Sequence, residues 1–152
     1  MPCVINEWIF HDINGANGLR AQERVGHFLE VFRDRGDRIV VLRHSAWAHK
    51  AWQLWKEQDV RVQILSKLLY LGILIDPLKC IYLNPDDVQA LPNDLAEQIS
   101  ADDAYLFETA LAGNATMIVT TDTRLMNIAT NSKRYGIELR FRDDFYADMG
   151  LR

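Results

Sequence analysis

Short apolar runs alternate with amphipathic stretches along most of this chain. Five strands are predicted at residues 3–5, 38–42, 79–83, 117–120 and 137–141. These runs show little polar alternation, which is typical of parallel strands buried on both faces. Helical periodicity predicts helices at residues 19–35, 45–56, 62–74 and 123–132, with Ser45 as an N-cap. One more helix is opened by Ser100 and Asp103 and ended by Gly113 and Asn114.

The alternation of strands and helices predicts an α/β fold. A central, mainly parallel sheet covered by helices on both faces gives three layers, α/β/α, joined by right-handed crossovers. At 152 residues the chain is large enough for one good core and too short for two, so residues 1–152 are expected to form a single domain. In such folds the functional site lies at the carboxyl ends of the strands.

Composition narrows the choice of function. No apolar run reaches about 18 residues and no basic, cleavable leader opens the chain, so we expect a cytoplasmic protein without a membrane partner. Cys3 and Cys80 stand alone, which argues against a disulfide scaffold or structural zinc. The glycine-rich and G-x-S-x-G motifs of nucleotide-binding proteins and of serine hydrolases are also missing.

The net charge of −4 provides no global field that would attract a polyanion. Binding of nucleic acid therefore depends on local basic groups, or else these groups belong to a solvated surface of mixed sign. The candidates near the two ends of the chain are Arg33, Arg35, Arg38, Arg43, Arg124, Lys133, Arg134, Arg140 and Arg142.

Two aspartates carry the strongest chemical signal. Asp103 opens a predicted helix, and Asp122 follows the apolar run at residues 117–120. A strand that runs back alongside a helix delivers its last residues to the end where the helix begins, so the two carboxylates are expected to meet. An oxygen-rich pair of this kind suits Mg²⁺ or Mn²⁺, ions that orient phosphates and support phosphodiester cleavage.

The carboxyl half of the chain resembles a PIN domain. The shared pattern is an aspartate at a helix start (Asp103), Ala110, Gly113, an apolar strand and then T-x-D at Thr120 to Asp122, with YGIELRFRDDF matching the closing strand. The order of elements agrees across nearly the whole chain. The resemblance implies a metal-dependent endoribonuclease that uses Mg²⁺ or Mn²⁺ and acts on RNA. It also implies an antitoxin protein as a partner, as in toxin-antitoxin pairs, and leaves a homodimer open.

The amino half departs from the family pattern in two places. Asn6 stands where the resemblance expects an aspartate, with Glu7 beside it, and the helix after Ser45 carries His49 and Lys50 where it expects an acid. The resemblance therefore assigns metal binding to Asp103 and Asp122, and positioning of water to Asn6 or Glu7. Thr120, Thr121, Ser45 and Lys50 are expected to support the ligands or to contact substrate.

Other interpretations of these residues remain open. Ser100 and Asp103 have the spacing of a capping box, and Asp122 suits a cap of the next helix. Trp47, Trp52 and Trp55 either stack on nucleobases or, as their helical spacing favours, pack in the core. The depleted acidic set keeps two alternatives to catalysis: a non-catalytic PIN-like domain that binds RNA or a protein partner, and a structural or oligomerising domain.

Overall fold

The computed structural model describes residues 1–151 and contains one sheet of five parallel strands. In spatial order these are β3 (Cys80–Leu83), β2 (Arg38–Leu42), β1 (Pro2–Ile5), β4 (Met117–Thr120) and β5 (Glu138–Phe141). Every neighbouring pair is parallel. The predicted α/β class with a central parallel sheet is therefore confirmed.

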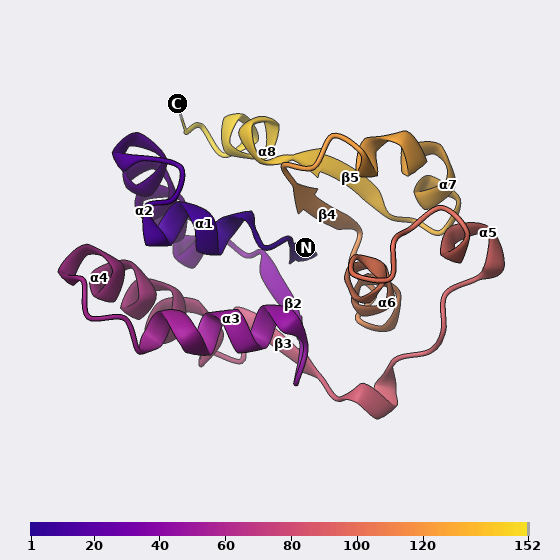
Figure 1. The fold of residues 1–152 in the computed structure, drawn as a ribbon, viewed down its shortest axis with the longest axis horizontal. Coiled ribbons are helices and arrows are strands. Elements are labelled where there is room, and N and C mark those ends of the chain that lie inside the picture. The colour runs from indigo at the N-terminus through magenta and orange to yellow at the C-terminus, as the bar shows by residue number, and fades with distance from the viewer. Residues whose placement is uncertain (152) are drawn as a thin grey trace.

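One face of the sheet is covered by the helices of the amino half and by the last helix. They are α1 (Trp8–Asn14), α2 (Leu19–Asp34), α3 (Ala46–Trp55), α4 (Val60–Leu69), its π-helical continuation η1 (Tyr70–Leu74) and α8 (Arg142–Asp148). Figure 1 shows α1 to α4 together on the left of the sheet. Their buried side chains form one hydrophobic cluster with Ile5, Ile39 and Val119.

The other face carries the helices between β3 and β5. They are η2 (Pro85–Asp87), α5 (Asn93–Ala96), α6 (Ala104–Ala112), η3 (Leu125–Ile128) and α7 (Ala129–Arg134). Val4, Val40 and Ile118 point to this side and join a second cluster. Neighbouring strand residues thus enter opposite clusters, as the alternation of side chains along a strand requires. Helices thus cover both faces of the sheet, and the predicted three-layer arrangement is confirmed (Figure 1).

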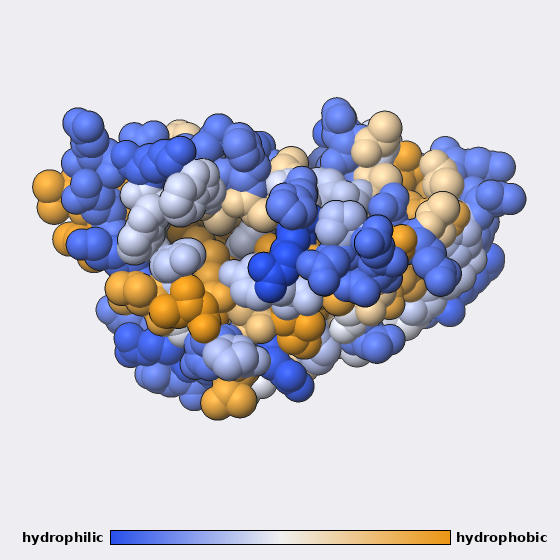
Figure 2. Space-filling view, turned by 90° about the horizontal axis from the view of Figure 1, so that it is seen from below, coloured by the Kyte–Doolittle hydropathy of each residue, from blue (hydrophilic) through white to orange (hydrophobic). Residues whose placement is uncertain are grey.

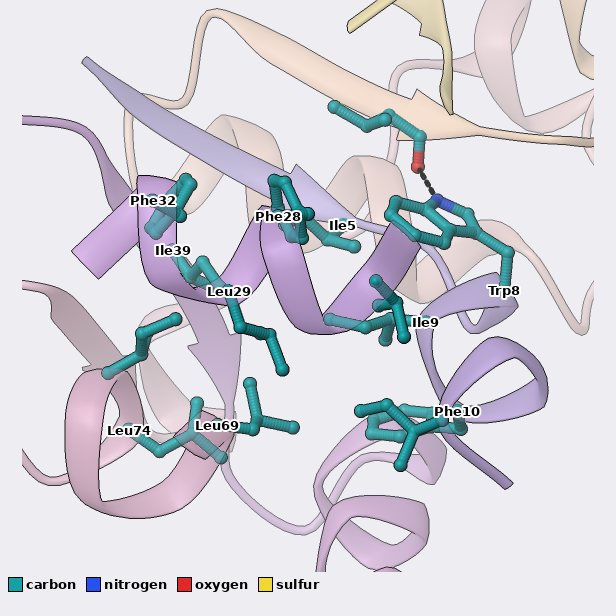
Figure 3. Packing of buried hydrophobic residues seen from close by; sticks show 14 of the residues in the cluster. Ile5, Trp8, Ile9, Phe10, Phe28, Leu29, Phe32, Ile39, Leu69 and Leu74 are labelled. Atoms are coloured by element: carbon teal, nitrogen blue, oxygen red, sulfur yellow. Dashed lines mark hydrogen bonds between the residues drawn. The ribbon is translucent and has the colours of Figure 1, made fainter. Parts of the chain in front are cut away.

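The larger cluster is rich in aromatic side chains. Phe28 on α2 lies at its centre, with its ring centroid 6.0 Å from that of Trp8 and 5.2 Å from that of Tyr146. Figure 3 shows Trp8 and Ile9 of α1 facing Phe28 and Leu29 of α2, with Ile5 of β1 close by. This packing anchors the chain immediately after β1, where the candidate site begins.

Helix ends follow the local chemistry of the chain. Ser45 caps α3 by accepting a hydrogen bond from the Ala48 amide at 3.2 Å, as predicted. At the end of α6, a side-chain carbon on Gly113 would lie 2.5 Å from Val40 Cγ1, so a glycine is needed for the close approach to β2. Asn114 then turns the chain with a left-handed φ of 54°.

Several predicted elements differ in extent. The helix expected at residues 62–74 begins at Val60, where Asp59 caps it, and becomes π-helical from Tyr70. The helix expected at residues 123–132 divides into η3 and α7. Helices α1 and α8 were not predicted. Within residues 1–151, every helix is too short or too polar to span a lipid bilayer.

Candidate functional site

The candidate site lies at the carboxyl edge of the sheet. The ends of β1 and β4 bring Asn6, Glu7 and Thr120 to this edge, and Asp122 follows two residues later. Asp103 stands directly before α6, which packs against β1, β2 and β4. Parallel pairing of the strands explains why segments far apart in the sequence end at one edge.

Asn6 and Thr120 join the ends of the two central strands. The Asn6 amide nitrogen donates to Thr120 Oγ1 at 3.0 Å, and the Asn6 amide oxygen accepts from the Glu7 backbone at 2.7 Å. Thr120 is fully buried, and its hydroxyl also accepts from the Asp122 backbone at 3.0 Å. Asn6 and Thr120 therefore position Glu7 and Asp122, whereas Thr121 lies exposed on the surface.

Glu7 binds two side chains from opposite sides of the sheet. The chain leaves the strand at Ile5, and Glu7 already has helical backbone angles, so it is free of the strand alternation that would separate it from Asn6. Its carboxylate forms an ion pair with Lys50 of α3 and accepts a hydrogen bond from the Tyr105 hydroxyl of α6 at 2.9 Å. Burial, reinforced by the Glu7 charge, raises the pKa of Tyr105, which stays a neutral donor.

Asp122 is held by a residue two positions further along. Its carboxylate accepts from the Arg124 backbone at 2.9 Å, and Arg124 Nη2 lies 3.1 Å from its Oδ2. These hydrogen bonds with Arg124 lower the pKa of Asp122, so this acid is ionised near neutral pH. Asp122 thus closes the turn before η3, which agrees with a capping role as much as with a ligand role.

Asp103 does not cap α6 with its side chain, so the capping-box interpretation is wrong for this residue. Its Oδ2 instead accepts a hydrogen bond from the Ser100 hydroxyl at 3.0 Å. The pKa of Arg124 is raised first by its bond to Asp122 and also by the charge of Asp103. The meeting of Asp103 and Asp122 stays a prediction, because the contacts of the two carboxylates are separate: Asp103 with Ser100, and Asp122 with Arg124.

These contacts test how well the residues fit a divalent ion. Within residues 1–151 there is no group of three or more His, Cys, Asp or Glu side chains arranged to hold a metal. All three carboxylates of the candidate site, Glu7, Asp103 and Asp122, already accept hydrogen bonds or form ion pairs within the chain. Mg²⁺ uses one or two carboxylates where waters and phosphate oxygens complete its shell, so an ion held by Asp103 and Asp122 would need such additional ligands.

The basic residues predicted as nucleic-acid contacts are mostly paired with acids. Arg33, Arg35, Arg124, Arg140 and Arg142 each form an ion pair. Arg43 instead stacks on Tyr82, with its guanidinium carbon 4.6 Å from the ring centroid. The mixed-sign interpretation therefore describes five of the nine candidates. Among the described residues, the other four, Arg38, Arg43, Lys133 and Arg134, form no ion pair with a carboxylate, and Arg43 faces an aromatic surface.

Sequence reasoning missed the partners that neutralise the acids. Arg124 follows Asp122 by two residues, and that spacing was the available signal; Tyr105 binds Glu7, and no local signal indicates that contact. Lys50 was named only as a substrate contact, and its pairing with Glu7 has no local signature. Among the tryptophans, Trp47 is buried in the core as favoured, but Trp52 is 50% exposed.

Comparison of the chain with protein-family models, with curated proteins and with solved structures found no match. The fold itself remains informative. A parallel sheet of five strands in the order β3-β2-β1-β4-β5, with helices on both faces, is compatible with a PIN-like architecture.

Proposed function

We propose that this chain is a PIN-like domain that binds RNA at the carboxyl edge of its sheet and cleaves it slowly with Mg²⁺ or Mn²⁺. The observation that supports the proposal is the position of the two acids in the fold: Asp103 stands directly before α6, which packs on β1 and β4, and Asp122 follows the end of β4 by two residues. Carboxyl edges of parallel sheets are the usual ligand sites of open α/β folds.

In this proposal Asp103 and Asp122 hold the ion. Asp122 must exchange Arg124 for the ion, and that exchange costs little because the Arg124 side chain is 86% exposed and solvent screens surface ion pairs. The ion supplies positive charge beside the scissile phosphate. The released Arg124 guanidinium is then free to bind a neighbouring phosphate.

The test is cleavage of a labelled single-stranded RNA in the presence of Mn²⁺. We expect slow cleavage by the unmodified protein and none by Asp103→Asn or Asp122→Asn. Asp102→Asn is the matched control, since Asp102 is exposed, adjacent to Asp103 and assigned no contact in the site. Cleavage that survives both substitutions, or no cleavage of several RNAs with Mn²⁺ present, would remove the nuclease proposal.

One observation favours a second candidate, a non-catalytic RNA-binding domain. Lys50 lies on the helix where the PIN resemblance expects an acid, and its ammonium is bound to Glu7. A lysine at this place supplies a fixed positive charge without a metal. RNA binding measured by fluorescence anisotropy in EDTA separates the candidates. Binding that is independent of metal, together with no cleavage in Mn²⁺, selects the non-catalytic domain.

A further inference from the structure

A small aromatic pocket lies between α3, η1 and the outer strands β2 and β3. Its volume is about 130 Å³. Five of the side chains that line it are aromatic: Trp47, Trp52, Trp55, Tyr70 and Tyr82. Figure 2 shows the molecule from below the view of Figure 1, and orange and pale residues gather in its left half, where α3 and α4 lie.

The walls of this aromatic pocket are held in place by the fold. Trp55 packs on Tyr70 with ring centroids 4.7 Å apart, and Trp47 packs on Phe10 at 4.8 Å. The Tyr82 hydroxyl donates to the Leu74 carbonyl at 2.7 Å. Trp52 remains 50% exposed at the mouth. The pocket is therefore preformed, which keeps the entropic cost of binding low.

The size of the pocket selects one flat ring system. A volume of about 130 Å³ is far below the roughly 300 to 1,000 Å³ typical of pockets for drug-sized ligands. It corresponds to about four water molecules at roughly 30 Å³ each. Aromatic walls of this kind favour a planar heteroaromatic ring, because ring faces stack on one another.

The charges at the aromatic pocket favour an anionic ligand over a cation. The Arg43 guanidinium lies over Tyr82 at 4.6 Å, and the Lys56 ammonium lies over Trp52 at 5.0 Å. Within residues 1–151, neither Arg43 nor Lys56 forms an ion pair with a carboxylate. No acidic residue lines the pocket, so an aromatic cage for a quaternary ammonium group is disfavoured.

Two open grooves continue from the aromatic pocket. One of about 510 Å³ shares Ala48 and Trp52 with it and contains His44 and His49. Another of about 510 Å³ shares Tyr70 and Tyr82 and contains Arg43. A chain of nucleotides that placed one base in the pocket would thus have a groove with basic or titratable groups on either side.

We propose that the aromatic pocket binds one nucleobase, with Arg43 and Lys56 contacting the phosphates that flank it. This inference deepens the proposed function, because it rests on RNA being the ligand, but it needs neither the metal nor cleavage. The ligand chemistry is a planar base that carries phosphate. A free nucleotide and a single-stranded RNA both provide it, so the experiment must distinguish these sources.

The indole N–H signals of the four tryptophans report on the pocket in ¹H–¹⁵N NMR spectra. The probes are AMP, GMP, CMP and UMP, and a five-nucleotide homopolymer of each base. We expect the Trp52 and Trp55 signals to shift, because a stacked base changes the local ring currents. The Trp8 signal is the internal control: its N–H donates to the Val119 carbonyl at 3.0 Å, and Trp8 does not line the pocket.

Substitutions identify the contacts. Trp52→Ala should weaken binding about tenfold, since stacking of one base on an aromatic side chain contributes roughly 1 to 3 kcal/mol. Gln53→Ala is the matched control on the exposed side of α3 and should bind normally. Arg43→Gln should weaken AMP more than adenosine, because only AMP carries the phosphate.

The outcomes separate the alternatives. Shifts with the monophosphates identify a nucleotide site, and shifts with the oligonucleotides alone identify an RNA site; both support the pocket. No shift with any probe at millimolar concentration, or equal shifts of Trp8 and Trp52, overturns it. The mononucleotides should shift the same signals in EDTA, where no cleavage occurs, so a failure of the cleavage proposal is distinguishable from a failure of the pocket.

Discussion

Asp12 of α1 and Arg142 at the start of α8 form a buried ion pair although they are 130 positions apart in the sequence. Arg142 Nη1 lies 3.0 Å from Asp12 Oδ2, and Asp12 is only 1% exposed. Asn17 donates a further hydrogen bond to Asp12 at 2.7 Å. The pair joins the first helix of the chain to the last one and closes the aromatic core around Trp8.

We expect Asp12→Ala to lower the free energy of unfolding by about 1 to 3 kcal/mol, because it removes a buried acceptor and leaves Arg142 only its exposed partner, Asp143. Urea denaturation gives the measurement. Asp143→Ala is the control, since it removes the other carboxylate that contacts Arg142, and that carboxylate is exposed. The control should cost less than about 1 kcal/mol. Equal effects of the two substitutions would contradict a structural role for the buried pair.

Trp8→Phe and Trp47→Phe remove the same side-chain volume, so their effects on stability can be compared directly. The Trp8 indole N–H donates to the Val119 carbonyl at 3.0 Å, whereas the buried Trp47 indole N–H has no hydrogen-bond partner among the described residues. A buried donor without a partner costs about 1 to 3 kcal/mol, and a typical hydrogen bond contributes about 0.5 to 1.5 kcal/mol. We therefore expect Trp8→Phe to destabilise the protein more than Trp47→Phe, by at least about 1 kcal/mol in urea denaturation. The opposite order would contradict this assignment of the two indoles.

The strands could be predicted because their signal is local. Residues 38–42 and 117–120 are apolar runs bounded by polar or turn-forming residues, and the structure places β2 and β4 at those bounds. The missed helix α1 has no such signal. It begins at Trp8 directly after the strand, and Glu7 at its N-cap makes no capping hydrogen bond, so WIF reads as a continued apolar run.

The candidate site was predictable only in part, because only some of its residues carry a local signal in the sequence. Asp103 and Asp122 follow from helix start and strand end, which are local features. The partners of the acidic residues could not be predicted in this way. The hydrogen bond between Glu7 and Tyr105 spans 98 positions, and the pairing of Lys50 with Glu7 depends on how α3 packs against α1 and β2. Tertiary packing decides such contacts, and no residue spacing encodes them.

Alkaline pH should destabilise the fold in a defined window. Burial raises the pKa of Cys3 to about 12 and also raises the pKa of Tyr105 above its ordinary value of about 10. Groups with a raised folded pKa contribute stability that is fully present below their unfolded pKa and is lost as pH rises toward the folded value. The contribution of Cys3 and Tyr105 to the free energy of unfolding should therefore fall above about pH 9 and stay nearly level from pH 6 to 8.

Tyr105→Phe tests the tyrosine contribution directly. The substitution removes an ionisable hydroxyl whose raised pKa opposes stability at high pH, so the loss of stability between pH 9 and 11 should be shallower than in the unmodified protein. Thermal melts across this range give the slopes. Parallel slopes for the two proteins would show that Tyr105 ionises as easily in the folded chain as in the unfolded one.

The pairing of Lys50 with Glu7 predicts how a metal response could be introduced. Lys50→Glu would place two carboxylates where the ion pair now stands, close to the edge that carries Asp103 and Asp122. Without metal, repulsion between like charges should lower the melting temperature below that of Lys50→Gln, which merely removes the charge. With Mn²⁺, a ligand that binds only the folded state must raise the midpoint. The rise should be larger for Lys50→Glu than for Lys50→Gln or the unmodified protein. Identical Mn²⁺ responses of all three proteins would show that Lys50 does not face a metal position.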